Sequence, residues 1–149
     1  MKVFIEQSGE KNQKNVFDKI TGKFIKVVSI NVTYPYPYGY ILGTLAADGD
    51  ELDCYVITDK TLETESVAEC EPIGMVEWFE DGKEDHKILA ILVDEEREVD
   101  EEAKKKIIDF ALHFFDDRPD KRYHMGNFYG KEEAIKLLDA ARVTVSRLG

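Results

Sequence analysis

The sequence predicts an α+β protein in which a small β-barrel, or a strongly twisted sheet, has helices packed outside it. Short runs rich in Val, Ile and aromatic residues, bounded by turn residues, fill the first two-thirds of the chain. The last third has apolar residues at helical spacing. No repeat, low-complexity tract or linker composition divides the 149 residues, so we expect one domain over 1–149.

The expected strands are short because turn signals interrupt the apolar runs. Residues 18–22 and 80–83 combine Asp and Gly, as turns between neighbouring strands do. The β-branched and aromatic residues on either side suit a pleated, half-buried surface. We expect strands at residues 1–6, 23–30, 54–57, 73–79 and 87–93.

Two helices are expected after these strands. One apolar stripe consists of Ala103, Ile107, Ala111 and Phe115. Asp100 can cap the start of this helix, and the two glutamates that follow suit its positive end. A second helix is expected to begin near Lys131. Residues 116–130 between them are expected to form a connector long enough to carry function.

Composition excludes several classes of protein. With 43% hydrophobic and 34% charged residues, the chain is expected to be soluble and globular. A net charge of -11 argues against nucleic-acid binding and requires an anionic substrate to be approached through bound cations. No apolar run is long enough for a bilayer, and the first residues are too polar for a signal peptide. We expect no membrane partner.

Cys54 and Cys70 are the only cysteines, and their spacing matches neither a CxxC motif nor a zinc site. The simplest interpretation is two small buried hydrophobic residues in a reducing compartment, which favours the cytoplasm. A disulfide between them is the alternative.

A dense carboxylate cluster precedes the expected strand at 54–57. Asp48, Asp50 and Asp53 fall within six positions, and Gly49 gives the backbone freedom to bend around them. Crowded carboxylates repel one another unless cations neutralise them. A hard divalent ion with oxygen ligands would do so, which predicts a metal site. A simple Asp-Gly turn leading into a strand is the alternative.

A second acidic loop spans residues 80–87. By itself it is typical of a solvated hairpin tip. Asp85 and Lys87 are two positions apart at the start of an apolar strand, so their side chains should share a face. A carboxylate beside an ammonium suits a site that holds a metal and an anion together. His86, in the same loop, would be an unusual ligand for magnesium.

Residues 34–40 alternate tyrosine with proline and glycine. This stretch could be a polyproline-like ligand, although PxxP spacing is missing. It could be a base-stacking platform, which the acidic composition opposes. It could be a rigid aromatic wall whose hydroxyls donate to an anion. We favour the wall because the acidic cluster follows so closely.

These motifs resemble those of a known family. Tyr-Pro-x-x-Tyr-Gly-Tyr at 34–40, Thr-Leu at 44–45 and Asp-Gly-Asp-x-x-Asp at 48–53 closely resemble the signature of soluble family I inorganic pyrophosphatases. Glu-Pro-Ile-Gly at 71–74 and Glu-Asp-His-Lys-Ile-Leu-Ala at 84–90 are similar to its second active-site segment. The resemblance implies an OB-like five-stranded β-barrel with flanking C-terminal helices. Since prokaryotic members are usually hexamers, it also implies a homo-oligomer.

The resemblance also implies an activity, the Mg²⁺-dependent hydrolysis of inorganic pyrophosphate to two phosphates by a metal-activated water. Another divalent ion, such as Mn²⁺, is an alternative to Mg²⁺. Asp50 would be the general base, and Glu6 matches an acidic position that supports the site. The implied metal ligands are Asp48, Asp53, Asp85 and Glu80, the last where the family usually has aspartate. The implied phosphate contacts are Lys14, Tyr38 and Lys87.

Some positions depart from the family pattern. Val16 replaces a glutamate, Val28 replaces a phosphate-binding arginine, and the family's Tyr-Lys pair is absent near Arg118 and Pro119. The candidates to compensate are Lys23, Lys26, Lys121 and Arg122. A thinner phosphate clamp leaves two alternatives open: a larger, nucleotide-like phosphoanhydride substrate, or a catalytically degenerate homologue that binds metal or phosphate. Retention of Asp50 favours an enzyme.

Overall fold

The computed structural model describes the chain except for residues 10–12, 19, 31, 48, 115–121 and 143–149. The described part contains nine strands and two helices. In chain order these are β1 (Lys2–Gln7), β2 (Gln13–Phe17), β3 (Phe24–Ser29), β4 (Tyr38–Ile41), β5 (Asp53–Val56), β6 (Val67–Glu80), β7 (Lys83–Glu84), β8 (Lys87–Leu92), α1 (Glu101–Phe114), β9 (Tyr123–Gly130) and α2 (Lys131–Ala141).

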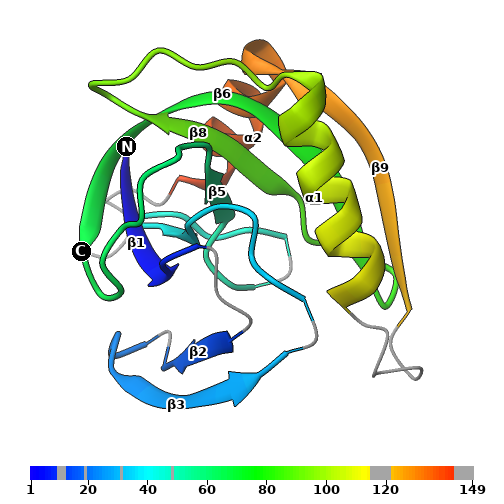
Figure 1. The fold of residues 1–149 in the computed structure, drawn as a ribbon. Coiled ribbons are helices and arrows are strands. Elements are labelled where there is room, and N and C mark those ends of the chain that lie inside the picture. Colours follow the sequence, from blue (N-terminus) through cyan, green and yellow to red (C-terminus); the bar gives the residue numbers. More distant parts are fainter. Residues whose placement is uncertain (10–12, 19, 31, 48, 115–121, 143–149) are drawn as a thin grey trace, which may run out of the picture.

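Five strands close into a ring. They are hydrogen-bonded in the order β1-β4-β5-β8-β6, and β6 pairs back with β1. Only β5 and β8 run parallel within this ring, so both begin at the same rim. The second half of the long β6 extends past the ring, where it pairs with β9 and β7 (Figure 1). The expected α+β class and OB-like five-stranded arrangement are confirmed.

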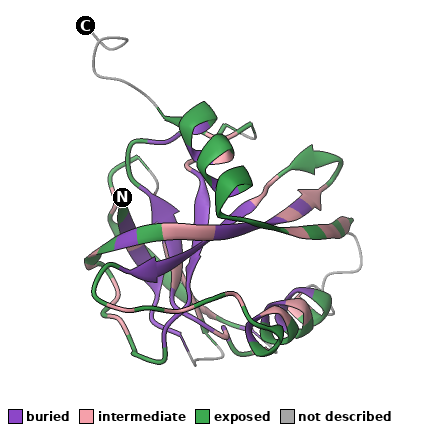
Figure 2. Ribbon diagram, turned by 90° about the horizontal axis from the view of Figure 1, so that it is seen from above, coloured by how far each residue is buried: buried purple, intermediate pink, exposed green. Residues whose placement is uncertain are grey.

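Alternating side chains of the ring strands serve two apolar clusters. Cys54 on β5 and Ile88 on β8 belong to a cluster that also contains the buried residues of α2. Tyr55 and Leu89, one residue further along, belong to a second cluster, which contains Ala103, Ile107 and Phe110 of α1. Figure 2 shows buried strands at the centre and helices whose outer sides are exposed. Because side chains alternate across a strand, Cys54 and Ile88 face one cluster, whereas Tyr55 and Leu89 face the other.

Helix α1 starts where the sequence predicts. The Asp100 carboxylate accepts a hydrogen bond from the Ala103 amide at 2.8 Å, as an N-cap residue does. Ile107 is 1% exposed under this helix, and burying such a side chain stabilises the fold by about 1.5–3 kcal/mol. In the part of the chain that is described, neither helix has the length and apolarity needed to cross a membrane.

The hairpin of β2 and β3 lies beside the ring as a separate two-stranded sheet (Figure 1). Its turn is held by Asp18, whose carboxylate accepts hydrogen bonds from the Ile20 and Thr21 amides. Lys14 is paired with Val28 across the two strands, so these two side chains share one face of the hairpin.

The predicted strands correspond to β1, β3, β5, β6 and β8, but β6 begins at Val67 instead of residue 73. Strands β2 and β4 were not expected. The prediction of a connector over 116–130 was wrong for its second half, because β9 occupies Tyr123–Gly130. This strand pairs with the extension of β6, a partner distant in sequence, and Gly126 weakens its local strand signal.

Candidate active site

The site is built where β5 and β8 begin. Asp53 and Lys87 are register partners on these parallel strands, and Asp85 lies two residues before Lys87. The Lys87 ammonium donates to Asp53 Oδ2 at 2.7 Å and to Asp85 Oδ2 at 2.9 Å. The structure thus brings together three of the predicted site residues, including the pair expected to share a face.

This ionic cluster is largely withdrawn from water. The side chains of Lys87 and Asp53 are each 11% exposed, and that of Asp85 is 18% exposed. Burial lowers the pKa of Lys87, but attraction and hydrogen bonds from the two carboxylates outweigh it and raise the pKa above its ordinary value. Removing one partner of such a buried pair costs about 3–5 kcal/mol, since the remaining charge has no compensation.

A hollow of about 280 Å³ lies next to the cluster. Its described lining consists of Asp50, Glu80, Asp81, Lys83 and Asp85. Four carboxylates therefore face one space with a single ammonium among them. The mutual repulsion of these carboxylates favours the entry of a positive charge, so the hollow suits a cation.

Local hydrogen bonds hold Asp50 at this hollow. The Asp50 carbonyl accepts from the Ala46 amide at 2.7 Å, and Gly49 takes the left-handed φ of 90° that the turn requires. The buried Thr44 hydroxyl accepts from the Leu52 amide at 3.0 Å, which joins the turn to the strand that follows. Asp48, the remaining predicted ligand, lies outside the described residues.

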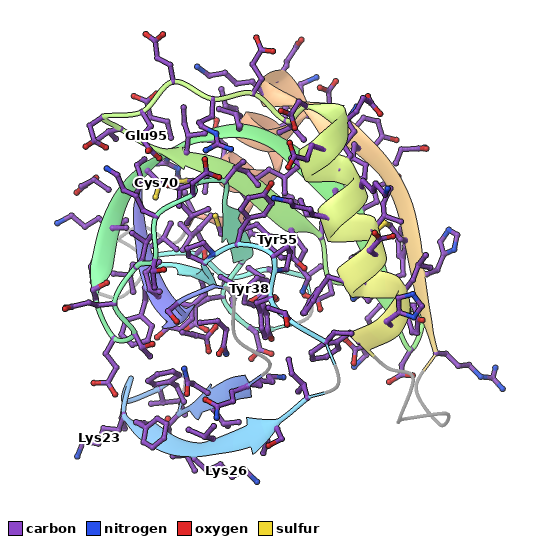
Figure 3. The ribbon with its side chains drawn as sticks, in the orientation of Figure 1. Lys23, Lys26, Tyr38, Tyr55, Cys70 and Glu95 are labelled. Atoms are coloured by element: carbon purple, nitrogen blue, oxygen red, sulfur yellow. The ribbon has the colours of Figure 1, made fainter. Side chains whose placement is uncertain are left out.

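Tyr38 contributes a ring to the same site. It is the register partner of Tyr55, with the ring centroids 4.9 Å apart, and the Lys87 ammonium lies 5.7 Å from the Tyr38 centroid. Figure 3 shows the two tyrosines together at the centre of the molecule. Burial, followed by the nearby Asp53 carboxylate, raises the pKa of Tyr38 well above its ordinary value. Its hydroxyl therefore keeps its proton at neutral pH.

The other tyrosines of the stretch 34–40 are core residues. Tyr34, Tyr36 and Tyr40 are each 3% exposed. Tyr34 packs on Phe110 of α1 at 4.5 Å between centroids. The expected aromatic wall is therefore mostly interior packing, and Tyr38 is its member beside the Lys87 ammonium.

Lys14 on the hairpin contacts the end of α1. Its ammonium lies 5.5 Å from the Phe114 ring centroid. Phe114 contacts Tyr34 at 6.2 Å, and Tyr34 contacts Tyr38 at 5.5 Å, so a row of rings joins Lys14 to the tyrosine of the site. Lys26, the register partner of Val16, shares the hairpin face that carries Lys14, and Figure 3 shows it well apart from Tyr38.

The sequence analysis did not include Asp81 and Tyr55 among the site residues, and it gave His86 no role. Asp81 lines the hollow in a left-handed conformation, with φ of 51°, which is typical of an Asp-Gly hairpin turn. Tyr55 could have been found, because the period of two from Asp53 puts it on the same face. His86 accepts a hydrogen bond from the Trp78 amide at 3.0 Å, which anchors the loop structurally.

The donor chemistry of the hollow fits a hard divalent ion. Among the described residues, no three of His, Cys, Asp and Glu are close enough to form a complete metal site. The described lining is nevertheless made of carboxylates and one lysine, and carboxylate oxygens are the donors preferred by Mg²⁺. Glu80 and Asp85, two of the predicted ligands, thus line a hollow whose donor type matches such an ion.

The fold and this hollow define a class of protein: a closed five-stranded, OB-like ring with a carboxylate-rich site at one rim. The chain belongs to the inorganic pyrophosphatase family, whose model matches residues 3–146. It is 35% identical over 149 residues to the inorganic pyrophosphatase of Geobacillus stearothermophilus, covering 93% of this chain and 90% of that one. It is 32% identical over 128 residues to that of Thermoplasma volcanium, covering 79% and 76%.

Solved structures agree with this membership. The inorganic pyrophosphatase of Helicobacter pylori superposes with a TM-score of 0.86 at 28% identity, covering 95% of this chain and 90% of that one. The inorganic pyrophosphatase of Thermus thermophilus superposes with a TM-score of 0.84, covering 99% and 90%. At 23% identity, the second comparison speaks for the fold alone.

Proposed function

We propose that this chain, as a single domain over residues 1–149, hydrolyses inorganic pyrophosphate to two phosphates. The observation that carries the proposal is the carboxylate-lined hollow beside the buried cluster of Lys87, Asp53 and Asp85. Membership of the inorganic pyrophosphatase family supports the substrate. An acidic hollow attracts cations, and bound cations would let a polyanionic substrate approach a chain of net charge -11.

The proposed metal ligands are Asp48, Asp53, Asp85 and Glu80, with Mg²⁺ as the ion and Mn²⁺ as the alternative. Carboxylate donors at the hollow support this choice over a softer metal. When bound, the ions supply positive charge that offsets the repulsion between pyrophosphate and an attacking water.

Asp50 is the proposed general base. Its side chain is exposed at the hollow, so a water next to the substrate can be within its reach. The carboxylate takes a proton as the water oxygen forms a bond to phosphorus and the anhydride P–O bond breaks. The proton held by Asp50 is then returned to solvent, and two phosphates leave.

Lys87, Tyr38 and Lys14 are the proposed phosphate contacts. The raised pKa of Lys87 keeps its charge, and the raised pKa of Tyr38 keeps its phenolic proton for donation to a phosphate oxygen. Such donors stabilise the charge that accumulates on the leaving phosphate. Lys14 takes this role from the family resemblance alone, and its ammonium lies over the ring of Phe114 at the end of α1.

A second candidate is a larger, nucleotide-like phosphoanhydride. The hairpin face that carries Lys14 also carries Val28, and Val16 lies two residues from Lys14 on that face. Both valines are partly exposed. An apolar surface next to a phosphate-binding lysine would tolerate an organic group.

We also propose a homo-oligomer, a hexamer by family resemblance, located in the cytoplasm. Cys54 and Cys70 are buried free thiols, and such residues are typical of reducing compartments.

The test is phosphate release from pyrophosphate, ADP and ATP, each assayed with Mg²⁺, with Mn²⁺ and with chelator alone. We expect metal-dependent release from pyrophosphate at a kcat/KM at least tenfold above that for either nucleotide. Preferential release from a nucleotide would instead establish the second candidate. Absence of release from all three would overturn both enzyme proposals.

A further inference from the structure

Lys87 occupies a position that one phosphate contact does not explain. Its ammonium is within hydrogen-bonding distance of two carboxylates at once, at 2.7 Å from Asp53 and 2.9 Å from Asp85. All three side chains are at least four-fifths withdrawn from solvent. Both carboxylates are also proposed ligands of the divalent ion. The ammonium therefore occupies one oxygen of each carboxylate that the ion would bind.

Asp53 and Asp85 need a positive partner whether or not a metal is bound. Water screens them poorly at this exposure, and two uncompensated carboxylates beside each other would destabilise the start of β5 and β8. Lys83 lines the adjacent hollow but is exposed, so its charge is screened and contributes little. Lys87 is therefore a buried cation that directly stabilises these two carboxylates.

We propose that Lys87 is a built-in counter-ion that substitutes for the divalent ion in the metal-free protein and thereby sets the metal concentration at which the site fills. A divalent ion that binds Asp53 and Asp85 competes with the ammonium for these two carboxylates. The ammonium then loses its partners and becomes available to a phosphate, which couples metal loading to substrate binding. This inference rests on the proposed function insofar as Asp53 and Asp85 are metal ligands there.

The experiment measures Mg²⁺ binding by titration calorimetry without substrate, and thermal unfolding with chelator and with Mg²⁺. Lys87→Met removes the charge, Lys87→Arg keeps it, and Lys83→Met is the matched control at the same hollow. We expect Lys87→Met to bind Mg²⁺ at least fivefold more tightly than wild type. Its Tm in chelator should fall by about 6 °C or more, and Mg²⁺ should restore it.

The controls make the role of Lys87 specific. Lys87→Arg and Lys83→Met should both bind Mg²⁺ within about twofold of wild type. Equal tightening by Lys83→Met and Lys87→Met would mean that net charge alone sets the affinity. That result, or unchanged or weaker binding by Lys87→Met, overturns the inference. If wild type hydrolyses pyrophosphate but Lys87→Met does not bind Mg²⁺ more tightly, this inference is wrong and the proposed function is unaffected.

A measurement on wild type covers the case in which Lys87→Met does not fold. Brief acetylation with an activated ester, followed by peptide mass spectrometry, reports how available each lysine amine is. We expect Lys87 to be protected in chelator and to react at least threefold faster with saturating Mg²⁺, whereas Lys83 reacts equally in both. Unchanged Lys87 labelling would refute displacement of the ammonium.

Discussion

Substituting Gly39 tests the closest approach between two strands of the ring. Gly39 lies opposite Ile5, where β4 pairs with β1. A methyl group added there would overlap the Phe4 carbonyl oxygen and lie 2.8 Å from its carbonyl carbon. Carbon atoms pack at about 3.5–4.0 Å, so the strands would have to separate. Strain of about 1–3 kcal/mol and one or two weakened ladder hydrogen bonds at about 1 kcal/mol each predict a loss of roughly 2–5 kcal/mol for Gly39→Ala.

The assay is urea and thermal unfolding followed by circular dichroism. A loss of this size corresponds to a Tm lower by roughly 4–20 °C in a chain of this length. Gly130→Ala is the matched control, because a methyl group there meets nothing within 4 Å and φ is an ordinary -84°. Its expected cost is less than about 1 kcal/mol. If Gly39→Ala unfolded within 2 °C of wild type, the close packing of β1 on β4 would be refuted.

Three further predictions concern the core and its ionisable groups. Ile107→Ala should destabilise by about 2–5 kcal/mol in urea unfolding, whereas the half-exposed Leu112→Ala should stay within about 0.5 kcal/mol; equal losses would contradict the placement of α1. Burial raises the pKa of the Cys54 thiol well above its usual value and that of Cys70 to about 11, so neither should react with Ellman's reagent until urea unfolds the protein. Burial also raises the pKa of Tyr55 above its ordinary 10.0, so the stability that depends on its neutral form is present below pH 10 and is lost as pH rises further. In an absorbance titration at alkaline pH, Tyr55→Phe should remove one late-ionising group. An unchanged late phase would contradict the burial of Tyr55.

Local spacing was enough to predict much of the site. Asp50 and Asp53 are close in sequence, as are Asp85 and Lys87, so alternation and turn signals could group each pair. The bond between Asp53 and Lys87, which are 34 residues apart, depends on the parallel pairing of β5 with β8. Only the resemblance to a family had put these two halves together.

Elements that depend on distant partners were beyond sequence reasoning. Strand β9 exists because β6 is long enough to extend past the ring and pair with it. The burial of Tyr34 follows from the position of α1, which no local pattern specifies. In each case tertiary contacts, and not intrinsic propensity, decide the outcome.

The role of Asp50 in metal-dependent hydrolysis is tested most directly by steady-state phosphate release from pyrophosphate under saturating Mg²⁺. The comparison is wild type, Asp50→Asn and Glu51→Gln, the last being a neighbouring carboxylate outside the described lining of the hollow. Loss of a general base predicts that Asp50→Asn lowers kcat by about 10²–10⁴-fold, with Glu51→Gln within about threefold of wild type. Calorimetry should show that Asp50→Asn still binds Mg²⁺. Turnover by Asp50→Asn that equals wild type would contradict the proposed mechanism.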